Sequence, residues 1–231
     1  MCWRHPWRRR RRCRPGPNLL YVLPGQVTRP QEALAQGAAS ILSRPLSDKE
    51  LDQLYKYLNL LVKWQRARRL VGSTDALWIV EHLFLDSLLF LRILPPTFGT
   101  LLDLGSGAGL PGVPIKIVKS GVEVTLVESR RRRASFLSSV VRDLGLGRTH
   151  VISDRVEARL DDLEGRFDAV VMRCAGDVRE LIPLGARLIS PNGVVVAAGP
   201  PRPGPLPLGE WVTVPGLKPG RTRRFAIYRH R

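Results

Sequence analysis

A glycine-rich run from Asp103 to Gly109 contains the residues whose types and spacing most clearly suggest chemistry. It reads Asp-Leu-Gly-Ser-Gly-Ala-Gly and follows directly from an apolar stretch. Gly105 and Gly107 lack a Cβ atom, so the chain can turn tightly there and its backbone can lie against a ligand. In open α/β sheets such a ligand lies beyond the carboxyl ends of the strands. The run therefore predicts a ligand-binding loop at a strand end.

Two acidic residues narrow the identity of that ligand. Glu128 ends the next apolar run, at the spacing expected of a carboxylate that accepts hydrogen bonds from ribose hydroxyls. Asp103 lies inside the preceding strand, where a carboxylate suits the cationic methionine end of S-adenosylmethionine and would repel a pyrophosphate. We therefore expect S-adenosylmethionine as the cofactor.

An NAD(P)-binding oxidoreductase is the first alternative. Gly107, Gly109 and Gly112 also satisfy the dinucleotide pattern GxGxxG. The position of Asp103 and the lack of a second domain for a hydride donor or acceptor count against it. A glycine-rich turn without any ligand is the remaining alternative.

The sequence does not favour a metal site or a cysteine nucleophile. Three cysteines (Cys2, Cys13 and Cys174) form no CxxC pair, and such a sparse, odd number is typical of a reducing compartment. His82 and Asp86 are spaced to share a helix face, but two ligands without a third predict a structural hydrogen bond. We expect Cys174 to be a packed thiol at a strand end. No apolar run approaches the roughly 18 residues of a membrane helix, so we expect a cytoplasmic protein.

The net charge points to a polyanionic partner. The chain has 37 Lys and Arg against 20 Asp and Glu, a formal charge of +17. Eight arginines precede Glu32, the first acidic residue, and removing them from +17 still leaves +9. Such a surface attracts nucleic acid. Of the four consecutive arginines that follow Ser129, we expect Arg132 and Arg133 to contact RNA phosphates, although a solvated helix start would have the same composition.

Strands and helices alternate from residue 101 onward, which predicts βαβ units and a parallel sheet. Helices are expected between the strands, for example over Arg133–Leu144 and Val178–Ile189. The expected strands are Leu101–Leu104, Val122–Val127, Val151–Ile152, Phe167–Met172 and Val194–Ala197, with short β-like runs at Trp211–Val214 and Phe225–Tyr228.

Three regions are predicted along the chain. Residues 1–40 are rich in Arg and Pro and are expected to be disordered, as an RNA-binding arm, an organellar presequence or sequence upstream of a misplaced start. Residues 41–96 are expected to form a helical segment, in which Ser47 and Glu50 make a capping box and a second helix runs from about Thr74 to Ile93. Residues 97–231 are expected to form the catalytic domain.

The stretch from Asp103 through Leu110-Pro111-Gly112-Val113-Pro114 resembles the signature of the RsmG (GidB) family, and so do His82-Leu83-Phe84-Leu85-Asp86-Ser87 and the closing Arg223-Arg224-Phe225. The resemblance runs from about Leu46 to the C-terminus. It implies a class I S-adenosylmethionine-dependent methyltransferase fold, Rossmann-like, with a mostly parallel seven-stranded sheet. It also implies methylation of N7 of a guanosine in the 530 loop, by a monomer whose partner is 16S ribosomal RNA or the small ribosomal subunit.

The same resemblance assigns roles to individual residues. Arg173 follows the fourth strand, and by resemblance it lies beside the cofactor and the target base, so we expect it to be the catalytic residue. Residues expected to bind the cofactor are Asp103, Gly105, Gly107, Leu110, Glu128, Val156, Glu157 and Arg173, with Val156 and Glu157 framing the adenine. Arg223 is expected near the same edge of the sheet and on the RNA.

The chain departs from the family where RNA contacts are expected. Gln65-Arg66 replaces the usual Asn-Lys, Arg69 replaces an Asn, and Ala198 replaces a lysine before Gly199. Guanine N7 is a lone-pair nucleophile that needs no general base, so catalysis should depend on positioning and electrostatics. Either nearby arginines replace the missing lysine, or the chain is a catalytically degraded RNA-binding relative that acts in ribosome assembly.

Overall fold

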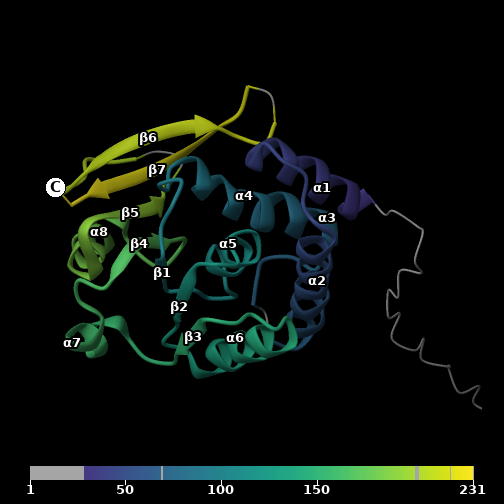
Figure 1. Ribbon diagram of the computed structural model, residues 1–231, viewed down its shortest axis with the longest axis horizontal. Coiled ribbons are helices and arrows are strands. Elements are labelled where there is room, and N and C mark those ends of the chain that lie inside the picture. The colour runs from purple at the N-terminus through teal and green to yellow at the C-terminus, as the bar shows by residue number, and fades with distance from the viewer. Residues whose placement is uncertain (1–28, 69, 201–202, 219, 231) are drawn as a thin grey trace, which may run out of the picture.

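The computed structural model describes residues 29–68, 70–200, 203–218 and 220–230, and it is built around a seven-stranded sheet (Figure 1). The strand order is β3-β2-β1-β4-β5-β7-β6. The first five strands in this order pair in parallel, whereas β7 is antiparallel to both β5 and β6. This arrangement confirms the predicted fold class. The strands are β1 (Thr100–Leu104), β2 (Glu123–Val127), β3 (Thr149–Ile152), β4 (Phe167–Met172), β5 (Ile189–Ala198), β6 (Glu210–Pro215) and β7 (Thr222–Arg229).

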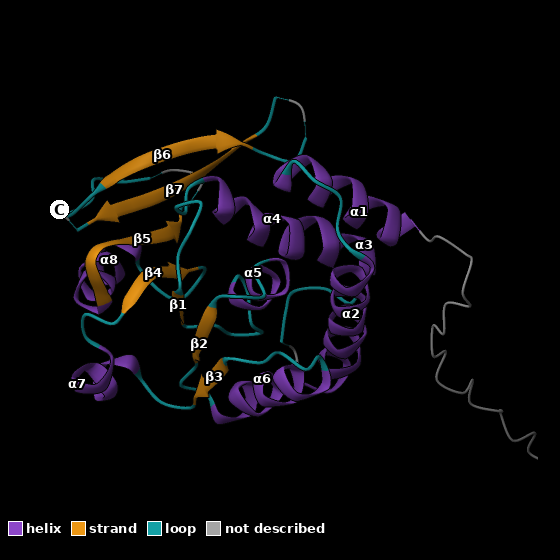
Figure 2. Ribbon diagram, viewed as in Figure 1, coloured by secondary structure: helices purple, strands orange, loops and turns teal. Residues whose placement is uncertain are grey.

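Each face of the sheet packs against its own layer of helices (Figure 2). Because successive strand residues point to opposite faces, Leu101 joins one buried cluster while Leu102 and Leu104 join the other. The first cluster lies under α5 (Gly112–Val118), α6 (Arg131–Asp143) and the N-terminal helices, and the second lies under α7 (Leu160–Leu163) and α8 (Val178–Leu188). The inner strands β1, β2, β4 and β5 are thus largely buried, as parallel strands covered on both faces are, whereas the edge strand β3 is partly exposed.

The N-terminal helical segment begins earlier than the sequence predicts. Helix α1 spans Arg29–Leu42, and its residues Leu34, Ala38 and Ile41 are buried in the core beneath that face of the sheet. The prediction of disorder over residues 1–40 is therefore wrong for residues 29–40, and residues 1–28 lie outside the described part of the chain. The helical segment accordingly starts at Arg29 rather than at residue 41.

Helix α2 (Asp48–Arg68) starts at the predicted capping box. The Ser47 N–H donates to Glu50 Oε2 at 2.7 Å, and the Glu50 N–H donates to Ser47 Oγ at 3.3 Å, so both orphan donors are satisfied. Arg44 pairs with the same glutamate at 2.6 Å, and this contact holds the pKa of Glu50 below its usual value.

The helix predicted over residues 74–93 is present but irregular. It consists of α3 (Ala76–Ile79), a π-helical turn η1 (Val80–Phe84), α4 (Leu85–Leu88) and a 3₁₀ turn η2 (Leu89–Arg92). Such single π-turns occur frequently at functional sites. None of the helices in the described part of the chain is long and apolar enough to cross a membrane.

Candidate active site

The glycine-rich loop leaves the carboxyl end of β1 in a conformation that favours glycine. Gly105, Gly107 and Gly109 have φ values of +69°, +60° and +95°. A Cβ atom at Gly105 would lie 2.7 Å from the Ala175 Cβ atom, so the loop packs directly against the chain that follows β4. The Ser106 N–H donates to the Val127 carbonyl of β2 at 2.9 Å. The loop is therefore held between the ends of three neighbouring strands.

Helix α2 contributes a buried tyrosine to this loop. The Tyr57 hydroxyl donates to the Ala108 carbonyl, and its ring stacks on Phe84 with centroids 4.9 Å apart. Burial raises the pKa of Tyr57 well above its usual value, and the nearby Asp103 raises it further. The phenol therefore stays protonated and keeps its donor. No local sequence pattern assigns this tyrosine to the site.

Asp103 is wholly buried in β1 beside the start of α5. Its Oδ2 atom accepts a hydrogen bond from the Gly112 N–H at 2.8 Å, whereas Oδ1 has no hydrogen-bond partner in the described part of the chain. Burial raises the pKa of the carboxyl from 3.8 to about 7, although the Gly112 N–H and the charge of Arg173 both lower it. A buried carboxylate with one unpaired oxygen fits the cationic ammonium end of S-adenosylmethionine.

Glu128 lies just beyond the carboxyl end of β2 and holds the loop from the other side. Its Oε2 atom accepts from the Gly107 N–H at 2.9 Å, and its Oε1 atom accepts from the Arg130 N–H at 2.8 Å. Each carboxylate oxygen has two lone pairs, so both oxygens keep an acceptor position that ribose hydroxyls could use.

Arg173 follows β4 and is tied to the π-turn of the N-terminal segment. Its two Nη atoms donate to the carbonyls of Leu83 and His82, at 3.3 Å and 2.8 Å. Its Nε atom lies 3.4 Å from Asp86 Oδ2. The charge of Arg173 also acts on the carboxyl of Asp103. The structure therefore brings the predicted catalytic arginine and the predicted cofactor carboxylate into one site.

The other expected cofactor residues lie around the same strand ends. Leu110 is buried within the loop, and Val156 is buried on the α8 face of the sheet, in a cluster that also contains Leu104 and Val127. Glu157, in contrast, is exposed.

Known proteins resemble this chain over the segments that form the site. A family model for GidB, described as rRNA small subunit methyltransferase G, matches residues 50–199, a range that includes Tyr57, Asp103, Glu128 and Arg173. The chain belongs to this family.

Two curated relatives carry the same description, ribosomal RNA small subunit methyltransferase G. The one from Syntrophus aciditrophicus is 36% identical over 168 residues, which cover 71% of this chain and 69% of the relative. The one from Stenotrophomonas maltophilia is 36% identical over 172 residues, which cover 72% and 79%. The solved structure of TrmN from Thermus thermophilus is 18% identical with a TM-score of 0.50, covering 64% of this chain and 49% of that chain, and supports the fold alone.

Arginines surround the site of this GidB-family chain. Arg132 is exposed on the first turn of α6, and Arg133 is half-buried there with an Nη atom 3.8 Å from the place a Cβ atom of Gly107 would occupy. Arg223 on β7 pairs with Asp86 at 2.9 Å and donates to the Gly199 carbonyl at 3.0 Å. A guanidinium therefore lies beside Gly199, next to Ala198, where the resemblance predicts a lysine.

Three details of the site differ from the sequence predictions. His82 does not bond Asp86: its Nδ1 atom lies 3.1 Å from the Trp78 carbonyl, and its ring stacks on Trp78. Asp86 instead faces two arginines, and the sequence did not predict these contacts. Cys174 is exposed with a φ of +53° rather than packed. No cluster of three metal-ligating side chains occurs among the described residues.

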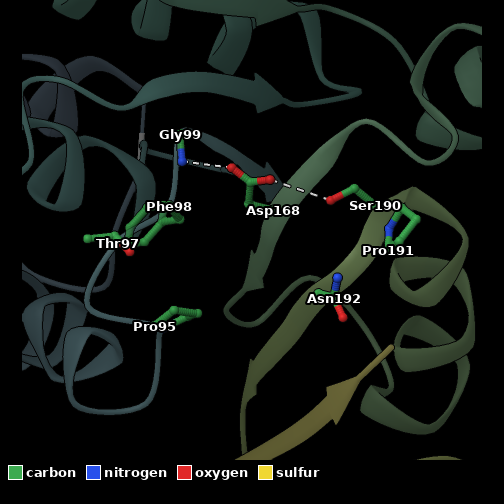
Figure 3. Close-up of a pocket in the computed structure, with 8 residues that line it drawn as sticks. All are labelled: Pro95, Thr97, Phe98, Gly99, Asp168, Ser190, Pro191 and Asn192. Carbon is green, nitrogen blue, oxygen red and sulfur yellow. Dashed lines mark hydrogen bonds between the residues drawn. The ribbon is translucent and has the colours of Figure 1, made fainter. Parts of the chain in front are cut away.

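A hollow at the opposite end of the sheet is separate from this site (Figure 3). Asp168, near the start of β4, lines this hollow. Its Oδ2 atom accepts hydrogen bonds from the N–H groups of Gly99 and Thr100, at 2.7 Å and 3.0 Å. The Ser190 hydroxyl donates to its other oxygen at 3.4 Å. The hollow is lined by Pro95, Thr97, Phe98, Gly99, Asp168, Ser190, Pro191 and Asn192. It lies at the amino ends of the strands, where the α/β fold does not place its ligands.

Proposed function

We propose that the protein transfers a methyl group from S-adenosylmethionine to N7 of a guanosine in the 530 loop of 16S ribosomal RNA, in the cytoplasm. The match to the GidB family over residues 50–199 carries this proposal. The unpaired oxygen of buried Asp103 supports the cofactor independently of the family, because a buried carboxylate without a partner is costly unless a ligand satisfies it.

The protein's task in this reaction is to position two ligands. S-adenosylmethionine supplies an electrophilic methyl group, and the N7 lone pair attacks it without losing a proton. Asp103 would hold the ammonium group, Glu128 the ribose hydroxyls, and the backbone of the glycine loop would approach the cofactor closely. Because N7 is hidden in the narrow major groove of A-form RNA, the target nucleotide must be unpaired or turned out of its stack.

Arg173 contributes charge and orientation rather than proton transfer. A donor directed at N7 would block its lone pair, so the guanidinium must use other acceptors, such as guanine O6 or a phosphate oxygen. The arginine has five N–H groups. Its contacts with the carbonyls of His82 and Leu83 and with Asp86 leave donors for an RNA oxygen. Arg223 beside Gly199 supplies a cation near the lost lysine, which supports retained activity over a degraded relative.

Methyl transfer to 30S subunits that lack the modification tests the proposal. The wild-type protein should add one methyl group, which mass mapping should place on N7 of a guanosine. Arg173→Ala should lower kcat/KM at least tenfold, about 1.4 kcal/mol of barrier. Arg179→Ala, which removes an exposed arginine of α8 that pairs with the N-cap residue Asp177, should leave the rate unchanged. A wild-type protein without activity would support the degraded relative instead.

Ligand-dependent stability separates the cofactor from its main alternative. S-adenosylhomocysteine should raise the thermal midpoint, because a ligand that binds only the folded state stabilises it. NADH at the same concentration should not raise it. The reverse result would assign the glycine loop to a dinucleotide.

A further inference from the structure

Asp86 joins two arginines that come from distant parts of the chain. Its side chain is 15% exposed, and that of Arg173 is 13% exposed. Asp86 Oδ2 lies 3.4 Å from Arg173 Nε, while Oδ1 lies 2.9 Å from Nε of Arg223. One carboxylate on α4 thus bridges the end of β4 and the start of β7.

The π-turn places the acceptors that surround Arg173. The carbonyls of His82 and Leu83, which receive the guanidinium, belong to η1, and Asp86 follows one turn later on α4. The Ser87 hydroxyl donates to the same Leu83 carbonyl at 2.6 Å. All the named partners of Arg173 therefore come from the one irregular helix, and together they fix the plane of the guanidinium.

The charges explain why a carboxylate is needed at this point. Two guanidinium groups that share a half-buried site repel each other, and an anion between them offsets that repulsion. With one carboxylate for two arginines, the cluster keeps a net positive charge for an anionic ligand. An ion pair of this kind, partly screened from water, also orients its members more firmly than an exposed pair does.

We propose that Asp86 is a positioning residue for methyl transfer: it fixes the orientation of Arg173 at the carboxyl end of the sheet and couples Arg223 to it. This inference rests on the proposed function, because the role of Arg173 does. The carboxylate acts through the arginine, so it needs no contact with cofactor or RNA.

Asp86→Asn keeps the shape of the side chain and removes its charge. It should lower kcat for 30S methylation about tenfold while KM for the subunit and the affinity for S-adenosylhomocysteine change less than threefold. A substitution that only destabilised the fold would lower the thermal midpoint and the amount of folded enzyme, while kcat per folded enzyme would stay the same. Glu81→Gln is the matched control, because the Glu81–Lys218 pair at 3.1 Å also joins this segment to the end of the chain without touching Arg173. It should leave kcat unchanged.

A double-mutant cycle gives the sharpest test. Asp86→Asn added to Arg173→Ala should slow the enzyme no further, because the residue it positions is already gone. Independent, additive losses would overturn the proposal, and so would an Asp86→Asn enzyme with wild-type kcat. If Asp86→Asn does not fold, Asp86→Glu should show the same selective loss of kcat and the same lack of effect with Arg173→Ala. An active wild-type enzyme beside an unaffected Asp86 variant would reject this inference alone, whereas an inactive wild type would reject the proposed function.

Discussion

Two aspartates on neighbouring strands, at opposite ends of the sheet, differ in how fully their carboxylates are satisfied. Asp168 at the amino end accepts from two backbone N–H groups and from the Ser190 hydroxyl. Asp103 near the carboxyl end accepts from one N–H group, keeps an unpaired buried oxygen and has a pKa raised to about 7 by burial. The visible hollow lies beside the satisfied residue (Figure 3). The candidate active site is therefore distinguished from the hollow by unmet hydrogen-bonding capacity rather than by concavity.

Exchanging each carboxylate for an amide should separate the two roles most strongly. Asp103→Asn should weaken S-adenosylhomocysteine binding about a hundredfold, roughly 2.7 kcal/mol, because the ligand's ammonium loses its buried counter-charge. Asp168→Asn should leave the affinity unchanged. Isothermal titration calorimetry on both variants measures this directly, and an equal loss in both would remove the distinction between the two ends.

The pH dependence of binding should come from the same carboxyl. Ammonium binding requires ionised Asp103, so the affinity for S-adenosylhomocysteine should fall about tenfold between pH 8 and pH 6. Stability has the opposite trend. Because the pKa of Asp103 rises from 3.8 in the unfolded chain to about 7 in the folded protein, the folded state binds more protons between pH 3.8 and pH 7. The contribution of Asp103 to the free energy of unfolding therefore falls as the pH rises toward 7. Asp103→Asn should remove that slope and raise the thermal midpoint at pH 8. Affinity that does not change with pH would show that this carboxyl does not bind the ammonium.

Removing the satisfied carboxylate should affect stability alone. Asp168→Ala leaves the N–H groups of Gly99 and Thr100 without their acceptor, which should lower the free energy of unfolding by about 1–3 kcal/mol. Ser190→Ala should have a smaller effect, because its hydrogen bond is the longest of the three. Chemical denaturation measures both changes, while calorimetry should find cofactor affinity intact. Impaired cofactor binding in either variant would connect the hollow to the active site.

The local pattern of the sequence was sufficient to predict the sheet and the glycine loop. Strand periodicity, the strand-end acid Glu128 and the capping box at Ser47 are features of short sequence windows, and the structure has them where they were expected. Helix α1 was missed although Leu34, Ala38 and Ile41 have helical spacing, because the Arg- and Pro-rich composition before it favoured disorder for the whole region.

Long-range pairings could not be predicted in the same way. Asp86 and Arg223 are 137 residues apart, and only the folded sheet brings β7 beside the N-terminal helices. The bond from Tyr57 to the glycine loop depends in the same way on how α2 packs. Asp86 and Arg223 both lie in stretches that resemble the GidB family, so the resemblance marks their segments without revealing their contact.

The hydrogen bond from Tyr57 also limits which segments of this protein could be exchanged with those of a relative. The helix that carries the tyrosine belongs to the N-terminal segment, whereas the Ala108 carbonyl that accepts its hydrogen bond belongs to the glycine-rich loop. The ring of Phe84, from the same segment, stacks on the tyrosine and completes the contact. A chimaera that exchanges the N-terminal helices between relatives to alter RNA choice would therefore also replace the tyrosine that supports the glycine-rich loop. Such a graft should keep cofactor binding only if donor and recipient match at these three positions.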